Sequence, residues 1–412
     1  MSAEHGFTPV LIGTDLNAYH MATAFHEGFG VKPHVIGKMA LGYVSYSTII
    51  ESITLVDELD TAEAFLPALL QFAKKHHDDA APLLLVGTND QYVRLIIEHA
   101  SALGEHYRFN YPTAELLETL QLKELFYPFA EQHGLTIPET HIHQAGEPLE
   151  AEKISRFPVI VKPSDPVQYN RNKFQGQEKI YRVYSAEELR GVVDRVESSG
   201  YRSSLIIQDF IPGGDTYVYE SDLYLHTDGR AEFVNLAQVV LQEHEPTAIG
   251  NFAAVRSQFN REVMTQLKDF LEGIGYTGLA NVDLKYDERD GEFKILEVNT
   301  RQGRSSSHAT AQGHNLAGYL VEDVVRRNPS SECVYVDTEI LYTVVPRSIL
   351  KTYVDDPAVL AEVDRLYREK KLHTPMIARA DRFHLKRRAW VAVRGIRYKR
   401  KYANATWAQQ AH

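Results

Sequence analysis

The sequence predicts an α/β protein whose N-terminal part is built on a parallel β-sheet. Residues 8–100 alternate apolar strand-like runs with helix-like runs, an order typical of βαβ units. The run TPVLIGTD also reappears in similar form as APLLLVGTND, so two strands end in a Gly-Thr turn. Ligands of such sheets bind at the carboxyl ends of the strands, which makes Asp15, Asn17, Asn89 and Asp90 candidate ligand contacts. Each of them also suits a helix N-cap.

Helices and strands continue to alternate after residue 100. Residues 113–136 have a helical pattern, with an interruption expected near Pro128. FPVIVKPS predicts a short buried strand that ends at Lys162, and the long polar segment 165–178 follows it. The later elements are the strand IYRVYS, the helix AEELRGVVDRVESSG, the strand SLIIQDF with a Pro-Gly-Gly break, and the helix REVMTQLKDFLEGIG.

Residues 279–308 predict a β-hairpin whose turn is the polar run DERDG. Glu297 and Asn299 are two residues apart in the second strand and therefore point to the same face. Asp283 lies on the partner strand, within reach if the register allows. Two carboxylates and an amide oxygen form the ligand set that Mg²⁺ prefers when it bridges phosphates. A metal–phosphate site explains this pattern better than a solvated hairpin does.

Positive charges are placed to meet an anion. Lys162 ends an apolar strand, where a compact ammonium suits a phosphate oxygen. Arg301 and Arg304 follow the hairpin and suit a carboxylate or phosphate. The Pro-Gly-Gly break exposes backbone groups that can bind a purine edge, with Gln208 and Asp215 as further candidates.

Composition excludes several classes of protein. The chain has 412 residues, and its single cysteine, Cys333, excludes an internal disulfide and a multi-cysteine zinc site. Its apolar runs are too short for a membrane span or a secretion signal, so a cytoplasmic location is expected. The net charge of −11 argues against nucleic-acid binding, but residues 379–401 alone carry +9. This basic tail suits peripheral membrane contact, binding of a nucleotide-linked precursor, or packing on the acidic remainder.

The motifs FPVIVKPS, QDFIPGGD, NVDLK and EVNTRQGRSSS, in this order, resemble the ATP-grasp ligase family. The resemblance implies an α+β ATP-grasp fold with ATP and two Mg²⁺ ions as cofactors. It also implies roles for particular residues. Lys123 and Lys162 resemble the phosphate-binding lysines of the family. The adenine-binding strand and hinge correspond to Gln208, Asp209, Phe210 and Ile211. Asp215 resembles a ribose-binding acid. Asp283, Glu297 and Asn299 match magnesium ligands. Gly303, Ser305, Ser306 and Ser307 match positions that bind transition-state oxygens and the substrate carboxylate. Independently of the resemblance, the chemistry of acyl-phosphate formation gives Arg301 or Arg304 the role of positioning the carboxylate and the oxyanion, and the strand-end position makes Asp15 a candidate substrate-binding residue.

Within this superfamily the chain resembles the D-aspartate ligase family, most specifically in LKYDERDGEFKILEVNTRQGRSS. The resemblance implies that the β-carboxylate of D-aspartate is activated as an acyl phosphate. It is then joined to the lysine ε-amine of UDP-MurNAc-pentapeptide in peptidoglycan synthesis. The alternatives are an ATP-grasp ligase for another amino acid or amine, and a nucleotide-binding regulatory or membrane-peripheral protein without turnover.

The expected domain order follows the same motifs. We expect an N-terminal α/β domain over residues 1–120, a small ATP-grasp subdomain over 121–204, and a large one with the Mg²⁺ and ATP site over 205–330. A C-terminal extension over 331–412, basic from residue 379, completes the chain. One departure from the family is that residues 165–178, where a glycine-rich phosphate loop is common, contain only Gly176. This segment is a candidate lid.

Overall fold

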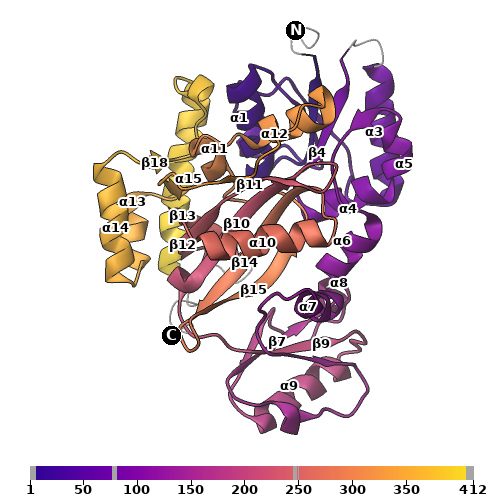
Figure 1. The fold of residues 1–412 in the computed structure, drawn as a ribbon, viewed down its shortest axis with the longest axis vertical. Coiled ribbons are helices and arrows are strands. Elements are labelled where there is room, and N and C mark those ends of the chain that lie inside the picture. The colour runs from indigo at the N-terminus through magenta and orange to yellow at the C-terminus, as the bar shows by residue number, and fades with distance from the viewer. Residues whose placement is uncertain (1–5, 77–80, 245–247, 249, 405–412) are drawn as a thin grey trace. The chain divides into compact units, whose positions relative to one another are not determined.

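The computed structural model describes residues 6–76, 81–244, 248 and 250–404 of the chain. The chain divides into two compact units (Figure 1). Unit 1 comprises Met1–Ala114, Gly214–Val282 and Asn299–His412, and unit 2 comprises Glu115–Gly213 and Asp283–Val298. The four-part division expected from the sequence remains a prediction.

The first sheet of unit 1 is the parallel sheet expected from the N-terminal sequence. Its five strands have the order β3-β2-β1-β4-β5, and all neighbours are parallel. The strands are β1 (Thr8–Ile12), β2 (His34–Gly37), β3 (Ser52–Leu55), β4 (Leu83–Gly87) and β5 (Tyr107–Arg108). The helices between them are α1 (Leu16–Phe29), α2 (Gly42–Ser45), α3 (Ala62–Lys75), α4 (Asp90–Glu98) and α5 (Ala100–Gly104).

Both faces of this sheet are covered, and its central strands, β1 and β4, are buried at every position. Leu11 of β1 packs in one core with α1, whereas Val10 and Ile12 pack in another core with α3 and α4. Successive strand residues point to opposite faces, so a run such as PVLI supplies both cores at once. This arrangement fixes the polar turns after β1 and β4 at one edge of the sheet.

The second sheet of unit 1 is mainly antiparallel. Its path runs β14-β10-β12-β13-β17-β18, with β11 and β16 attached beside β10 and with β15 paired to β14. The strands are β10 (Val218–Leu225), β11 (Ala231–Val234), β12 (Leu236–Gln242), β13 (Phe252–Gln258), β14 (Gly278–Asp287), β15 (Glu292–Asn299), β16 (Val334–Tyr335), β17 (Leu341–Thr343) and β18 (Leu372–His373). Helix α10 (Arg261–Gly273) lies against strands β10 and β11 (Figure 1).

The expected hairpin at 279–308 is confirmed as β14 and β15, whose outer part, Asp283–Val298, belongs to unit 2. Short helices follow it in unit 1: α11 (Ser307–Ala311), α12 (Leu316–Val321) and a π-helical turn, η4 (Glu322–Arg326).

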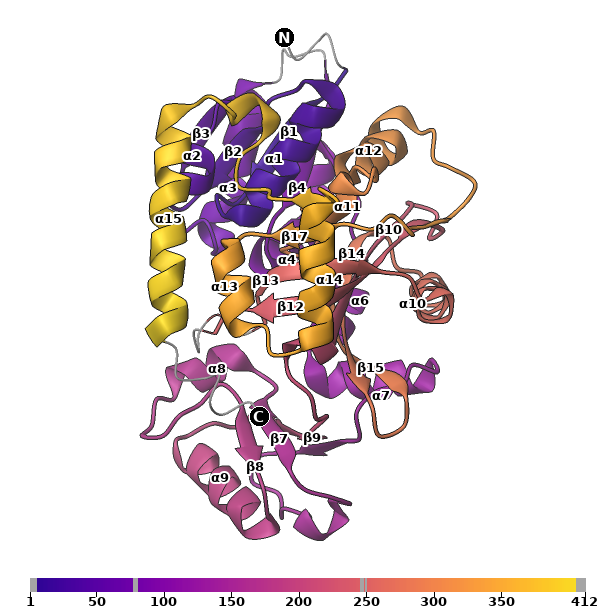
Figure 2. The same ribbon diagram turned by 90° about the vertical axis from the view of Figure 1, so that its left-hand side faces the viewer.

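The C-terminal segment of unit 1 is helical. Its elements are α13 (Arg347–Tyr353), α14 (Pro357–Arg368), the short 3₁₀ helix η5 (Arg379–Asp381) and the long helix α15 (Leu385–Asn404). Figure 2 shows α15 beside α2 and α13. Trp390 of α15 packs on Tyr43 of α2 with ring centroids 5.0 Å apart, edge to face. Most of the basic tail is therefore a helix that packs on the rest of unit 1.

Unit 2 is built on a four-stranded antiparallel sheet with the order β6-β9-β7-β8. The strands are β6 (Thr140–His143), β7 (Val159–Pro163), β8 (Tyr181–Val183) and β9 (Leu205–Asp209). The helices are α6 (Ala114–Gln121), α7 (Lys123–Gln132), α8 (Pro166–Arg171) and α9 (Ala186–Ser198), with a 3₁₀ turn, η2 (Ala151–Lys153). Leu189, Val192 and Val196 of α9 pack on β7 and β9.

The helical region 113–136 differs from its expected form. The break lies at Leu122, between α6 and α7, and Pro128 lies inside α7. Pro128 is the sixth residue of α7, so its missing N–H removes only the bond to the Glu124 carbonyl near the start of the helix. The interruption predicted at Pro128 is therefore wrong.

Candidate active site

A polar cavity lies in unit 1 where the parallel sheet changes direction. In the order β3-β2-β1-β4-β5 the chain moves outward from β1 to β3 and then returns to the other side of β1. The crevice at the carboxyl ends of β1 and β4 is the switch point at which open α/β sheets bind ligands. A cavity of about 290 Å³ opens there, lined by Asp15, Leu16, Asn17, Tyr43, Thr88, Asn89, Asn251, Arg301 and Arg304.

The Gly-Thr turns hold the two strand ends together. The hydroxyl and the backbone N–H of Thr88 both donate to the Ile12 carbonyl, at 2.8 and 3.1 Å. Gly13 has a φ of +126°, and a Cβ there would lie 2.0 Å from Oγ1 of Thr88, so only glycine fits. The side chain of Asn17 donates to the Thr88 carbonyl at 3.0 Å. The repeated Gly-Thr pattern thus builds the floor of the cavity.

Asp15 and Asn89 each combine capping with a place in the cavity. Oδ1 of Asp15 accepts from the N–H of Ala18 at 3.2 Å and caps α1, while Asn89 caps α4 through the N–H of Tyr92 at 2.9 Å. Oδ2 of Asp15 has no hydrogen-bond partner among the residues that the structure describes. Burial raises the pKa of Asp15, although Arg304 and Arg301 oppose this shift through their charges. The second carboxylate oxygen therefore remains for a cation in the cavity.

The two arginines of the cavity are held differently. Arg301 is paired with Asp90 through Nε at 2.9 Å and Nη2 at 3.0 Å, and its Nη1 donates to the Gln302 carbonyl. Arg304 is paired only through Nη2, with Glu243 at 3.1 Å. Within the described part of the chain, the remaining N–H groups of Arg304 meet no acceptor. Arg304 is therefore the better placed of the two to bind a substrate carboxylate through two parallel hydrogen bonds.

Two buried carboxyl groups support the loop that carries these arginines. Ser305 donates to Glu220, and the N–H of Gly303 donates to Asp222 at 3.1 Å. Gly303 fits only as glycine, since a Cβ would lie 2.5 Å from Nδ2 of Asn281. Burial is the main cause that raises the pKa of Glu220, and the charge of its neighbour Asp222 adds to it.

This buried pair predicts that stability falls as pH rises. Glu220 keeps a proton in the folded state at pH values where an unfolded glutamate, with an ordinary pKa near 4.5, has lost it. The free energy of unfolding should therefore decrease above that pH, by at most about 1.4 kcal/mol per pH unit for one proton. Glu220→Gln should flatten this slope, measured by urea denaturation between pH 5 and 9. An unchanged slope in the variant would contradict the assignment.

The candidate metal ligands of unit 2 are Asp283 and Glu297. Nζ of Lys123 lies 3.1 Å from Oε2 of Glu297. The charge of Lys123 is the main cause that lowers the pKa of Glu297 to about 2, with Lys162 and Asp283 also contributing. Glu297 is therefore ionised at neutral pH, as a magnesium ligand must be, and the carboxylate donor set fits a hard cation. When bound, Mg²⁺ would neutralise charge on the phosphates.

Lys162 is held by neutral oxygens. Its Nζ donates to the Tyr127 hydroxyl at 2.8 Å and to Oε1 of Gln208 at 3.1 Å. The side-chain amide of Gln208 in turn donates to Oγ1 of Thr140 at 2.8 Å. Hydroxyl and amide oxygens orient the ammonium without neutralising it, so its charge remains for a phosphate.

The expected hinge residues of unit 2 have structural partners. Asp209 is buried and paired with Arg156 at 3.1 Å and with Arg289. The guanidinium of Arg182 lies 3.8 Å from the ring centre of Phe210, whose N–H donates to the Pro158 carbonyl. Ile211 is buried. Their roles in nucleotide binding stay a prediction.

The remaining predicted site residues lie in unit 1. Asp215 accepts from the backbone and side-chain N–H groups of Gln242 at 2.8 and 3.0 Å, at the start of the 3₁₀ turn η3 (Asp215–Tyr217). Asn299 donates to Oδ1 of Asn281 at 3.2 Å. The three serines are buried, and the hydroxyl of Ser306 has no partner among the described residues. Asn299 and Asp215 thus belong to a different unit from Asp283, Glu297 and Gln208.

Sequence reasoning missed several residues of the cavity and its support. Tyr43 and Asn251 line the cavity, Glu243 binds Arg304, and Asn281 joins the buried carboxyl pair to Asn299. Thr88 also lines the cavity. The sequence could have indicated this residue, because Thr88 has the same place in the second Gly-Thr turn that Thr14 has in the first.

The chain has a relative of known activity over nearly its whole length. No protein-family model matches it. It is 33% identical over 385 residues to the D-aspartate ligase of Enterococcus faecium (strain Aus0004), which covers 91% of each chain. The chain belongs to the D-aspartate ligase family. This family consists of ATP-grasp ligases, enzymes that join a carboxylate to an amine and convert ATP to ADP.

Solved structures support the fold. The biotin carboxylase domain of the Hydrogenobacter thermophilus 2-oxoglutarate carboxylase, solved with MgADP, has a TM-score of 0.61 at 14% identity. The match covers 81% of this chain and 74% of that one. The L-amino acid ligase from Bacillus licheniformis has a TM-score of 0.55 at 16% identity, covering 78% and 75% of the two chains. The ATP-grasp fold expected for this D-aspartate ligase family member is confirmed, and ATP with Mg²⁺ is the cofactor pair of such enzymes.

No helix in the described part of the chain combines the length and apolar character needed to cross a bilayer.

Proposed function

We propose that the protein joins the β-carboxylate of D-aspartate to the lysine ε-amine of UDP-MurNAc-pentapeptide, through an acyl phosphate. The observation that carries this proposal is the charge pattern of the cavity at the ends of β1 and β4. An amino dicarboxylic acid has two carboxylates and one ammonium. The cavity has Arg301 and Arg304 as cations and Asp15 as an anion, so its charges complement those of aspartate.

We assign the amino acid to this cavity. Oδ2 of Asp15 would accept from its ammonium, and the unpaired edge of Arg304 would bind a carboxylate. The hydroxyls of Ser306 and Ser307 would contribute donors toward the carboxylate and the tetrahedral oxyanion. The Gly303 N–H and the Ser305 hydroxyl already donate to Asp222 and Glu220, so these two residues would support the loop instead. The orphaned hydroxyl of Ser306 supports this assignment most directly, because a buried donor without a partner is costly unless a ligand satisfies it.

We assign ATP to the residues with the matching motifs. Lys123 and Lys162 would hold the phosphates, and the segment from Gln208 to Ile211 would hold the adenine. The role of Asp215, which belongs to unit 1, in binding the ribose stays a prediction. Asp283 and Glu297 would hold Mg²⁺, which would supply positive charge for the phosphates. The role of Asn299, which belongs to unit 1, as a further ligand of the two expected ions stays a prediction. Segment 165–178, with α8 inside it, remains a candidate lid that would protect the acyl phosphate from water.

The proposal is tested by measuring ADP release with a panel of D- and L-amino acids, with and without UDP-MurNAc-pentapeptide. Turnover that requires both D-aspartate and the pentapeptide is expected. Turnover with another amino acid but not with D-aspartate would favour the alternative of a ligase with a different substrate. Absence of ADP release with every pair would favour a nucleotide-binding protein without turnover. The cytoplasmic location remains a prediction.

Asp15→Asn should raise the KM for the amino acid by about 100-fold, because it removes one partner of a charge pair inside the cavity. Stability should change little, since asparagine caps a helix as well as aspartate does. The measurement is steady-state kinetics together with the melting temperature. Asp356→Asn is the matched control, since Asp356 caps α14 through Ala358 and Val359 and does not line the cavity. An unchanged KM in the Asp15 variant would remove its assignment to the ammonium.

A further inference from the structure

Helix α15 carries an apolar stripe on its outward face. Leu385, Ala389, Ala392 and Ile396 follow one another at intervals of four, three and four residues, which places them on one side of a helix. Leu385 is 78% exposed and Ile396 is 55% exposed. Phe383, just before the helix, is also 78% exposed. The stripe therefore faces away from the protein.

The orientation of α15 is fixed by buried arginines on its opposite face. Nε of Arg387 donates to the Met376 carbonyl at 2.8 Å, and Nη1 donates to the Gly42 carbonyl at 3.1 Å. Nη1 of Arg394 donates to the Val344 carbonyl at 3.0 Å. The helix thus buries two arginines beside the aromatic side chains Tyr398 and Tyr402 and leaves leucine and isoleucine outward. Its hydrogen bonds prevent rotation that would bury the stripe.

Cations without acidic partners flank the stripe. The exposed basic side chains between residues 377 and 400 form no ion pair with a carboxylate among the described residues; they are Arg379, Arg382, Lys386, Arg388, Arg397, Lys399 and Arg400. Exposed cations elsewhere in unit 1 do find such partners, for example Arg347 with Asp364 and Lys371 with Glu339. The positive charge beside the stripe is therefore uncompensated.

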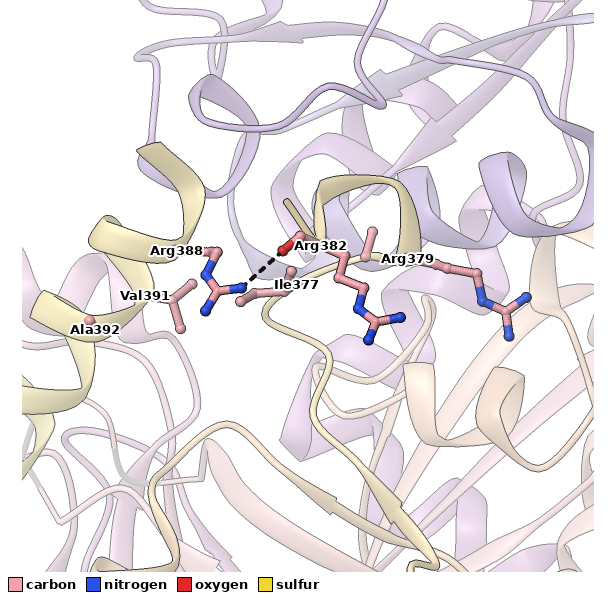
Figure 3. Close-up of a pocket in the computed structure, with 7 residues that line it drawn as sticks. Ile377, Arg379, Arg382, Arg388, Val391 and Ala392 are labelled. Carbon is pink, nitrogen blue, oxygen red and sulfur yellow. Dashed lines mark hydrogen bonds between the residues drawn. The ribbon is translucent and has the colours of Figure 1, made fainter. Parts of the chain in front are cut away.

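Three of these arginines surround a hollow beside the start of the stripe. A cavity of about 490 Å³ is lined by Arg379, Arg382 and Arg388 over the apolar side chains Ile377, Ala378, Val391 and Ala392. Figure 3 shows Arg388 directed toward Arg382, whose carbonyl accepts its hydrogen bond at 3.4 Å. Guanidinium groups around an apolar floor suit a phosphate attached to an apolar molecule.

We propose that this surface, Ile377 to Arg400, docks on the anionic headgroups of a phospholipid bilayer. Phe383 and the α15 stripe enter the interface, and the flanking cations bind lipid phosphates. A second copy of the chain is a poorer occupant, because two such surfaces would bring like charges together. A soluble phosphate ligand leaves the exposed apolar stripe unexplained. The chain outside residues 379–401 carries −20, so an anionic membrane repels it and selects this face.

The test is co-sedimentation of the full-length chain with phosphatidylcholine vesicles, with and without phosphatidylglycerol. Binding is expected only with phosphatidylglycerol and should weaken with salt. The double variant Arg379→Gln, Arg382→Gln should bind roughly 30-fold more weakly, since each cation contributes about 1 kcal/mol. The double variant Leu385→Ser, Ile396→Ser should also lose binding. Leu55→Ser and Arg347→Gln are matched controls on exposed positions of unit 1 and should bind as the native chain does.

The proposal is overturned by equal binding to neutral vesicles or by no binding to anionic ones. Native-like binding of the leucine–isoleucine variant would also overturn it, because purely electrostatic attraction would then suffice. Sedimentation of the chain without vesicles would point to a second copy as the occupant. Binding of inorganic phosphate that is lost in the arginine variant, with no vesicle binding, would indicate a soluble phosphate site.

Discussion

Glu297→Gln is expected to lower turnover by roughly 10³-fold or more, because in the proposed site it removes a charged ligand from the Mg²⁺ ion that would neutralise the transferring phosphoryl group. The fold should persist. The lost ion pair with Lys123 joins side chains that are 42% and 26% exposed. Such a pair contributes about 1 kcal/mol or less. The measurement is single-turnover ADP formation over a range of Mg²⁺ concentrations, with circular dichroism as the check on folding.

Glu292→Gln provides the matched control for this substitution. Glu292 begins the same strand, β15, but is exposed, and it should keep native turnover. If Glu297→Gln retained full activity at limiting Mg²⁺, the metal assignment would be wrong. A higher Mg²⁺ requirement, in contrast, would tie the loss to the ion rather than to the fold.

Arg304→Lys should lower kcat/KM for the amino acid by roughly 10²- to 10³-fold, because lysine cannot form two parallel hydrogen bonds to a carboxylate. KM for ATP should change much less, since Arg304 lines the cavity of unit 1 that we assign to the amino acid. The measurement is steady-state kinetics with each substrate varied in turn.

Arg347→Lys is the control for the arginine substitution, since Arg347 is an exposed residue paired with Asp364 outside the cavity. Equal losses for ATP and for the amino acid in Arg304→Lys would show a general structural defect. Unchanged kinetics would shift the carboxylate contact to Arg301, whose Nε and Nη2 are already engaged by Asp90.

Local patterns were sufficient for the parts of the site that lie at strand ends. The two Gly-Thr runs predicted that Asp15 and Asn89 follow buried parallel strands, and the switch point between β1 and β4 brings both to one cavity. The hairpin was predictable because strand periodicity and a polar turn coincide at 287–291. These features depend on few residues that are close in sequence.

Other features depend on contacts that no local pattern encodes. Glu220 and Asp222 are two apart in β10, which by itself suggests a solvent-facing side of a strand, yet both are buried. Glu243 reaches Arg304 across 61 positions of the sequence. Arg387 and Arg394 lie in a strongly basic segment, which predicts exposed side chains, but both are buried against backbone carbonyls. In each case tertiary packing supplied partners that make burial of a polar group tolerable.

The chemical course of the reaction can be followed through one oxygen atom. In the proposed route a β-carboxylate oxygen attacks the γ-phosphorus, and ADP leaves with the electron pair of the broken P–O bond. The amine nitrogen then attacks the carbonyl carbon, and phosphate leaves with that carboxylate oxygen. One oxygen of the released phosphate therefore comes from the amino acid.

The most direct test is the reaction of D-aspartate labelled with ¹⁸O in its β-carboxylate, with ATP, Mg²⁺ and UDP-MurNAc-pentapeptide. Mass spectrometry of the inorganic phosphate is expected to find one ¹⁸O atom per phosphate released with the amide product. Phosphate without label, formed together with the amide, would contradict the acyl-phosphate route. Absence of any amide with D-aspartate would contradict the substrate assignment itself.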